Sequence, residues 1–222
     1  MKLIGLSDIH GNLIRVGPEF TADVAVIAGD MVPTSSVFHG TTSEGVMRQV
    51  EWVHSMFIPW LQSLPVRHVV LTWGNHDWFA DQQGGSLVPD LWWPENVHVL
   101  VNTSVDIEGV RFYGVPQTPR FHDWAFNEDD TPESLGRRWD AVPDGTRVLV
   151  SDGPPRGSCD SVGNLRVGSL TMERWLRGEA TNRPEVMVCG HIHEGAGQVS
   201  HCGSTTVYNV SIVTPGYKPK YK

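Results

Sequence analysis

Short apolar runs that end in polar clusters recur along the chain. Five such runs stand out: Lys2–Leu6, Val24–Ala28, Val66–Trp73, Arg147–Val150 and Val186–Cys189. Continuous apolar runs bounded by turn residues are typical of strands that are buried on both faces. The pattern therefore predicts a sheet core that contains these strands.

A helical periodicity lies between the second and third runs. Apolar side chains three and four residues apart mark one face of a helix from Val46 to Leu64. Pro59 should kink or divide this helix. A Thr-Pro-Glu sequence starts a second helix over residues 131–139. A third is expected over residues 169–177, with Gly178 as its stop.

Two hairpins are indicated later in the chain, each around a glycine-containing turn. One joins residues 105–107 to residues 110–113, and the other joins residues 199–201 to residues 205–210. Strands that alternate with helices, followed by hairpins, predict an α/β sandwich with mixed sheets. No linker or repeat divides the chain, so we expect one domain over residues 1–222, with 214–222 as a loose tail.

Composition limits the possible binding partners and the cellular compartment of the protein. The formal net charge of −8 argues against stable nucleic-acid binding, which needs a basic surface. No stretch approaches the roughly 20 apolar residues of a membrane span, and the N-terminus lacks the apolar region of a signal peptide. Cys159, Cys189 and Cys202 are widely spaced and odd in number, as free thiols in a reducing compartment would be. We therefore expect a cytoplasmic protein; its oligomeric state stays open.

The polar clusters at the strand ends carry the candidate chemistry. Ligands of α/β proteins bind beyond the carboxyl ends of parallel strands. The clusters supply oxygen and nitrogen donors without a thiolate: Asp8, His10, Asp30, Asn75, His76, Asp152, His191 and His193. This donor set suits Mn²⁺, Fe or Zn²⁺.

Each cluster alone also has an ordinary explanation. A Gly-Asp pair after a strand is common turn chemistry. Residues 74–77, Gly-Asn-His-Asp, and residues 190–193, Gly-His-Ile-His, are more specific, because a turn has little need of histidine between turn formers. The five clusters together favour a metal site.

In this order the motifs resemble the signature of calcineurin-like metallophosphoesterases. The resemblance spans residues 3–213 and is closest to the metallophosphoesterase-domain-containing (MPPED-like) proteins, through residues 113–127, 191–195 and 208–211. It implies an αββα four-layer sandwich of two mixed β-sheets flanked by helices, with a dimetal site at the carboxyl ends of the strands. Those proteins are phosphodiesterases that act on cyclic nucleotides, notably 2′,3′-cyclic ones, and on simple aryl diesters.

The resemblance also implies a ligand set for two divalent ions. One ion would be held by Asp8, His10, Asp30 and His193. The second would be held by Asp30 as a bridge, Asn75, Asp152 and His191. His76 would face the phosphate as a general acid or cationic stabiliser, with Asp77 orienting it from behind.

Asn75, His76 and Trp124 are the candidate substrate contacts. Trp124 lies in the stretch that resembles the MPPED-like proteins and could stack on a nucleobase. Ordinary packing is the alternative for this side chain.

One position departs from the family pattern. After the fourth apolar run the family usually has Thr/Ser-His-Gly-Pro-Pro, whereas residues 151–155 are Ser-Asp-Gly-Pro-Pro. The expected ligand histidine is thus Asp152, which has a shorter arm and adds a negative charge. We expect a weaker or altered second site that favours hard ions such as Mn²⁺.

The sequence as a whole predicts a dimetal hydrolase of small phosphodiesters. The first candidates are 2′,3′-cyclic nucleotides, with 3′,5′-cAMP and aryl diesters beside them, attacked by a metal-activated water or hydroxide. The alternatives are a phosphomonoesterase or nucleotidase, a nuclease, and a catalytically weakened scaffold, which only Asp152 suggests.

Overall fold

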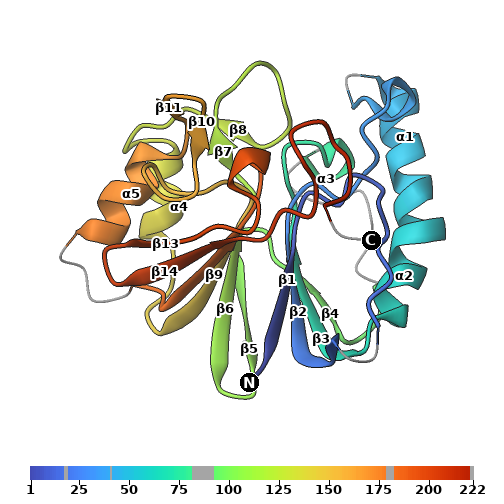
Figure 1. The fold of residues 1–222 in the computed structure, drawn as a ribbon, viewed down its shortest axis with the longest axis horizontal. Coiled ribbons are helices and arrows are strands. Elements are labelled where there is room, and N and C mark those ends of the chain that lie inside the picture. Colours follow the sequence, from blue (N-terminus) through green and yellow to red (C-terminus); the bar gives the residue numbers. More distant parts are fainter. Residues whose placement is uncertain (18–19, 41, 82–92, 179–182, 221–222) are drawn as a thin grey trace.

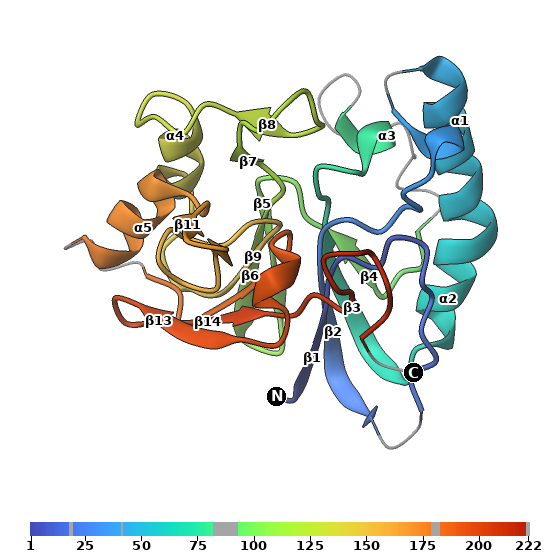
Figure 2. The same ribbon diagram turned by 45° about the horizontal axis from the view of Figure 1, so that its top comes forward.

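Two β-sheets packed face to face form the centre of the molecule, with helices on both outer sides (Figures 1 and 2). The computed structural model describes residues 1–17, 20–40, 42–81, 93–178 and 183–220. The predicted αββα sandwich is confirmed.

One sheet is built from the first half of the chain. Its strands lie in the order β1 (Leu3–Leu6), β2 (Ala22–Ala28), β3 (Val66–Thr72) and β4 (Val97–Val99). Every neighbouring pair of strands is parallel. This sheet is therefore purely parallel, whereas the sequence led us to expect two mixed sheets. The carboxyl ends of its strands therefore point in one direction.

The other sheet is mixed. Its order is β13 (Val199–Cys202), β14 (Thr205–Asn209), β12 (Val186–Cys189), β9 (Thr146–Ser151), β6 (Val110–Val115) and β5 (Thr103–Ile107). The two predicted hairpins form its antiparallel edges. In the β5–β6 turn both Glu108 (φ 49°) and Gly109 (φ 76°) are left-handed, the geometry that matches strand twist in a two-residue hairpin.

The core has one layer between the sheets and one beneath each helical side. Alternate residues of β2 separate these layers, because successive strand side chains point to opposite faces. Val24 and Val26 pack with Phe112 and Val150 of the opposite sheet. Ile27 packs instead beneath the helices, with Phe57. Strands buried on both faces explain why these runs are continuously apolar.

The predicted helix before β3 is a single rod with a wider turn in its middle. It consists of α1 (Ser43–Trp52), a π-helical segment (Val53–Phe57) and α2 (Ile58–Ser63). Pro59 lies in the first turn of α2, where its missing N–H is tolerated. The π turn absorbs the interruption, so the rod is not divided.

The remaining short elements complete the outer layers and the loops above the sheets. They are η2 (Ser36–Phe38), α3 (Trp78–Asp81), β7 (Thr118–Pro119), β8 (Asn127–Glu128), α4 (Leu135–Asp140), β10 (Ser161–Val162), β11 (Leu165–Arg166), α5 (Leu170–Arg177) and η5 (His193–Gly195). Helix α5 ends before Gly178 as predicted, and Ser169 caps its start by accepting from the Met172 N–H, at 3.1 Å. Helix α4 begins later than expected, because residues 131–134 form turns.

The segment 214–220, expected to be loose, folds back on the molecule. The Thr214 N–H donates to the Lys218 carbonyl (2.9 Å), and the Lys220 N–H donates to the Ile212 carbonyl (2.7 Å). Figure 1 shows this loop in dark red above the carboxyl ends of the strands. Residues 221 and 222 lie outside the described part of the chain.

Two further expectations concern the thiols and the membrane. The three cysteines are free and buried, in agreement with the prediction of unpaired thiols. Among the described residues, no helix combines the length and apolar character that crossing a membrane requires.

Candidate metal centre

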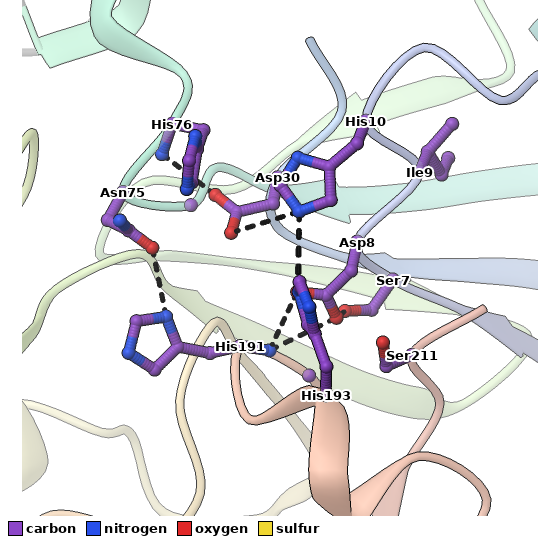
Figure 3. A network of polar contacts seen from close by, with 12 residues as sticks. Ser7, Asp8, Ile9, His10, Asp30, Asn75, His76, His191, His193 and Ser211 are labelled. Atoms are coloured by element: carbon purple, nitrogen blue, oxygen red, sulfur yellow. Dashed lines mark hydrogen bonds and ion pairs between the residues drawn. The ribbon is translucent and has the colours of Figure 1, made fainter. Parts of the chain in front are cut away.

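The predicted donors converge where the strands of both sheets end. Asp8 and His10 follow β1, Asp30 follows β2, Asn75 and His76 follow β3, Asp152 follows β9, and His191 and His193 follow β12. Figure 3 shows most of these side chains directed toward a common centre. Five strand ends from two sheets therefore build one site.

Within the described part of the chain, three sets of donors are each close enough to share an ion. Their members lie within 4.8 Å of one another: Asp8, His10 and His193; His10, Asp30 and His76; Asp30, Asp152 and His191. The first set holds three of the four residues expected around one ion, all but Asp30, and the third set holds three of the four expected around the other, all but Asn75. Asp30 lies between them, since its carboxylate is near both His10 and Asp152.

The first set, together with Asp30, comes close to the spacing of ligands on one ion. The Nε2 atom of His193 lies 3.0 Å from Oδ1 of Asp8 and 3.4 Å from Nε2 of His10. Nε2 of His10 is 3.8 Å from Oδ2 of Asp30. Two donors on one ion, with bonds of about 2.0–2.2 Å, stand about 3–3.5 Å apart.

The third set includes Asp152, the residue that departs from the family pattern. Nδ1 of His191 lies 2.9 Å from Oδ1 of Asn75 and 3.5 Å from Oδ2 of Asp152. The other oxygen of Asp152, Oδ1, is buried and has no hydrogen-bond partner in the described part of the chain. A buried, unpaired carboxylate oxygen is unfavourable without a cation. Asp152 therefore fits a metal ligand.

Electrostatics also favour cations in this site. Burial raises the pKa of Asp30 well above its usual value, and the charges of Asp8 and Asp77 raise it further. Burial, followed by the charges of Asp30 and Asp8, likewise raises the pKa of Asp152. Divalent cations beside these carboxylates would reverse this repulsion.

Two of the candidate ligands, His10 and His191, are held in the neutral form that metal ligation requires. Burial lowers the pKa of His10 to about 4, against the opposing effect of Asp8. Burial also lowers the pKa of His191. A neutral imidazole nitrogen is free to bind a metal.

Several site residues adopt a backbone conformation that side chains rarely favour. Asp8, His10, Asp30 and His191 have φ values of 53°, 44°, 58° and 65°. Such left-handed residues are uncommon outside glycine and gather at functional sites. Here they turn the chain sharply after a strand, so that the side chain points into the shared centre.

The glycines of the motifs leave room for the carboxylates. A Cβ on Gly29 would stand 2.1 Å from Oδ1 of Asp152. A Cβ on Gly190 would stand 2.2 Å from Oδ2 of Asp8. The glycines before Asp30 and His191 are therefore required by close approach of the backbone to the donors.

Asp77 is not placed to orient His76, contrary to expectation. Its two carboxylate oxygens accept from backbone N–H groups on two loops, those of Asp30 (3.0 Å), Met31 (3.0 Å), Val32 (3.1 Å) and Gly74 (2.8 Å). Asp77 is fully buried. Its role is to hold the loop after β2 against the loop after β3, which positions Asp30 and His76 through the backbone.

We expect Asp77→Asn to destabilise the fold without shifting the pH profile of any activity. The amide nitrogen would face N–H donors that now meet a carboxylate, and hydrogen bonds to charged groups contribute roughly 1.5–3 kcal/mol each. Removal of the buried charge offsets part of this loss, because burial raises the pKa of Asp77 to about 6. A loss of about 3 kcal/mol corresponds to roughly 6–12 °C in Tm for a domain of this size. Thermal unfolding measures the fall in Tm, with Asp129→Asn at an exposed position as the control. A shifted pH profile of activity at unchanged Tm would instead give Asp77 a role in orienting His76.

His76 is positioned from three sides. The backbone N–H of His76 donates to Oδ1 of Asp30 (2.8 Å), and its backbone carbonyl accepts from Nε2 of Gln49 on α1 (3.2 Å). The centroid of the His76 ring lies 4.8 Å from that of His10 and 4.4 Å from that of Trp124. Burial, and then the proximity of His10, lower the pKa of His76 well below its usual value. Trp124 thus contacts the candidate acid directly.

Three residues near the site were missed by the sequence analysis. Ser7 donates to the carboxylate of Asp8, and Gln49 bridges the loops of Phe38 and His76. Gln49 could have been noticed, because a glutamine on the apolar face of a helix usually has a buried partner. Tyr217 could not, since it lies far along the chain; its ring stands 4.9 Å from that of His10.

The chain is similar to known phosphoesterases. The profile described as calcineurin-like phosphoesterase matches residues 1–195. The human metallophosphoesterase domain-containing protein 1 is 29% identical over 240 residues, which cover 98% of this chain and 68% of that protein. A probable rhamnogalacturonate lyase C of Emericella nidulans is 28% identical over 91% of this chain, but only 18% of that protein is matched.

Solved structures support the fold. One crystal structure superposes with a TM-score of 0.66 at 14% identity, covering 95% of this chain and 90% of the other. Phosphopantetheinyl hydrolase from Mycobacterium tuberculosis gives a TM-score of 0.53, also at 14% identity, over 97% of this chain and 90% of that one. The family model matches most of the chain, and the candidate metal donors converge at one place. The chain therefore belongs to the calcineurin-like phosphoesterases, a family of phosphoester hydrolases that normally bind two divalent metal ions.

Proposed function

We propose that this chain hydrolyses small phosphodiesters, with 2′,3′-cyclic nucleotides as the first substrates to test. The observation that supports this most is the pair of donor sets joined at Asp30, with His76 beside them. Two ions in such sets lower the pKa of a bound water and neutralise charge on the phosphoryl group when they are present. The chain supplies the ligands, the positioning and the proton donor.

In this proposal each donor set holds one ion. Asp8, His10, Asp30 and His193 hold the first. Asp30, Asn75, Asp152 and His191 hold the second. Mn²⁺ is the first choice, with Fe or Zn²⁺ as alternatives, because the sets combine imidazoles with hard carboxylate oxygens.

His76 is proposed as the general acid for the leaving alkoxide. It lies within 4.8 Å of donors in the shared centre, and its backbone is fixed through Asp30 and Gln49. Burial keeps its imidazole neutral in the free protein. An anionic phosphate against the ring would favour the protonated form, so the proton becomes available when substrate binds.

A substrate and metal matrix tests the function. Purified protein is assayed with Mn²⁺, Fe²⁺ or Zn²⁺ on 2′,3′-cAMP, 3′,5′-cAMP, a bis-aryl phosphate and the matching aryl monoester. We expect metal-dependent turnover of the diesters and at least tenfold lower kcat/KM on the monoester. Preference for the monoester would instead assign a phosphomonoesterase, and no turnover with any metal would favour a scaffold.

Asp152→His is expected to strengthen the second ion site and to move its preference from Mn²⁺ toward Zn²⁺. A histidine restores a neutral nitrogen donor and removes one of the repelling buried charges. We expect the dissociation constant of the more weakly bound ion to fall by about tenfold, in the range that metal-site neighbours control. Metal titration by calorimetry measures it.

The matched variant Asp152→Asn separates charge from ligation. It keeps the size of the side chain but supplies only a weak amide oxygen, so the second ion should bind at least tenfold more weakly than in the parent protein. If both variants bind two ions with unchanged affinity and turnover, Asp152 is not a ligand.

A further inference from the structure

Tyr217 lies over the metal centre at the turn of the 214–220 loop. Its ring centroid is 4.9 Å from that of His10, 5.0 Å from that of His193 and 6.1 Å from that of His76. The first two contacts are edge-on, within the 4.5–7 Å range of favourable aromatic pairs. Tyr217 therefore contacts ligands of the first donor set and the candidate acid.

The loop is closed by its own hydrogen bonds, so the position of Tyr217 is defined. The Thr214 N–H donates to the Lys218 carbonyl, and the Tyr217 N–H donates to the Thr214 carbonyl (2.8 Å). Lys220 holds the loop against the residue that follows η5, because its Nζ donates to the Ala196 carbonyl. The φ of Tyr217 is 57°, a left-handed conformation that turns its side chain out of the loop.

Tyr217 also lines a cavity beside His76. The cavity has a volume of about 370 Å³, within the usual range for small-molecule sites. Its aromatic walls come from four separate segments of the chain: His39, Trp78, Trp124 and Tyr217. Tyr217 is 43% exposed, so its ring is accessible to a ligand as well as in contact with the site.

The walls suit a heteroaromatic ring rather than a plain hydrocarbon. Rings of Trp124 and Tyr217 offer faces and edges for stacking, and such stacking tolerates any planar base. The same cavity is lined by the exposed hydroxyl side chains of Thr34, Ser35 and Ser36. Hydroxyls can donate to and accept from the polar edge of a nucleobase.

We propose that Tyr217 is a specificity-determining residue, which together with Trp124 forms a subsite for the nucleobase of a nucleotide diester. The inference rests on the proposed function, and it adds that a loop some ninety residues after Trp124 selects the substrate. With the phosphate at the metal centre, a base in this cavity lies on the His76 side of it, where the leaving group must receive its proton.

Two substrates that share their scissile bond test the subsite. Adenosine 2′,3′-cyclic phosphate is compared with methyl ribofuranoside 2′,3′-cyclic phosphate, which has the same strained ring and no base. For Tyr217→Ala we expect kcat/KM to fall about 5- to 100-fold on the nucleotide, the range of one lost stacking contact. The base-free diester should change by less than about threefold, and Tyr217→Phe should stay near the parent on both.

Tyr208→Ala is the matched control, because Tyr208 is a partly exposed tyrosine on β14 that lines a different cavity. It should leave both substrates unchanged. An equal fall on both substrates for Tyr217→Ala would overturn the subsite and leave a structural role. A rise on both would identify Tyr217 as a cap that obstructs the site, which also overturns the proposal.

Binding without turnover separates this inference from the proposed function. Calorimetry compares 3′-AMP with ribose 3-phosphate on the parent protein and on Tyr217→Ala. If no diester is hydrolysed but 3′-AMP binding weakens selectively in the variant, the proposed activity fails and the subsite stands. If diesters are hydrolysed but the two ligands bind alike in both proteins, the activity stands and the subsite fails.

Discussion

Asp30→Asn is expected to lower kcat on a diester by about a thousandfold or more, since the charge of two ions contributes several kcal/mol to the transition state and each 1.4 kcal/mol is tenfold. Among the described residues, Asp30 is the one carboxylate that belongs to two of the donor sets. An amide in its place keeps the hydrogen bond from the His76 N–H but cannot bridge two cations. Steady-state kinetics at saturating Mn²⁺ measure the loss.

The same variant should have opposite effects on stability with and without metal. The pKa of the Asp30 carboxyl is raised in the folded protein, so above its unfolded pKa the ionised group destabilises the metal-free fold. A neutral asparagine removes that effect, and the Tm of the chelated variant should exceed that of the chelated parent. Added metal should raise the Tm of the parent more than that of the variant.

Asp106 forms an exposed ion pair with Arg111 and belongs to no donor set. Asp106→Asn serves as the control, because it also removes one carboxylate charge. It should leave kcat and the metal-induced rise in Tm as they are. Retention of two ions with near-parental kcat in Asp30→Asn would show that Asp30 does not bridge the centre.

His76→Ala is expected to reduce kcat by roughly 10²–10⁴-fold on substrates with an alkoxide leaving group, the usual contribution of a general acid. The loss should be much smaller on a bis-nitrophenyl phosphate, because a nitrophenolate leaves without prior protonation. Comparing 2′,3′-cAMP with the nitrophenyl diester on both proteins measures the difference. Two ions should still bind to the variant, since His76 belongs to neither proposed ligand group.

The control for His76→Ala is His201→Ala, an exposed histidine on β13. It should not change either rate. An equal loss on both diesters would assign His76 to charge stabilisation of the phosphoryl group instead of proton donation. An unchanged rate on 2′,3′-cAMP would remove His76 from the mechanism.

Much of the fold follows from local pattern. The runs at β1, at residues 24–28 of β2 and at β12 are continuously apolar because both faces of each sheet are covered, and this signal is visible in the sequence. The hairpins and α5 follow from turn and capping residues such as Gly109 and Ser169. The π turn before Pro59 and the late start of α4 were not visible in the spacing of the apolar residues.

The candidate site also has some features that the sequence reveals and others that it does not. The donors could be selected from the sequence, because each follows an apolar run and carries an oxygen or nitrogen. The role of Asp77 could not, since its carboxylate is bound to N–H groups of residues 30–32, more than forty positions away. The sequence suggested a partner for His76 next to it in the chain, whereas the fold provided Gln49 and Trp124.

The sequence by itself determined the strands, the donor types and the family to which the motifs belong. Each of these depends on side-chain chemistry and on spacing over a few residues. Only the tertiary structure decided that Asp30 stands between two donor sets, that the second oxygen of Asp152 is left unpaired, and that Tyr217 reaches the metal centre. Those features arise from strand ends and loops that meet across two sheets, and no local pattern encodes such long-range contacts.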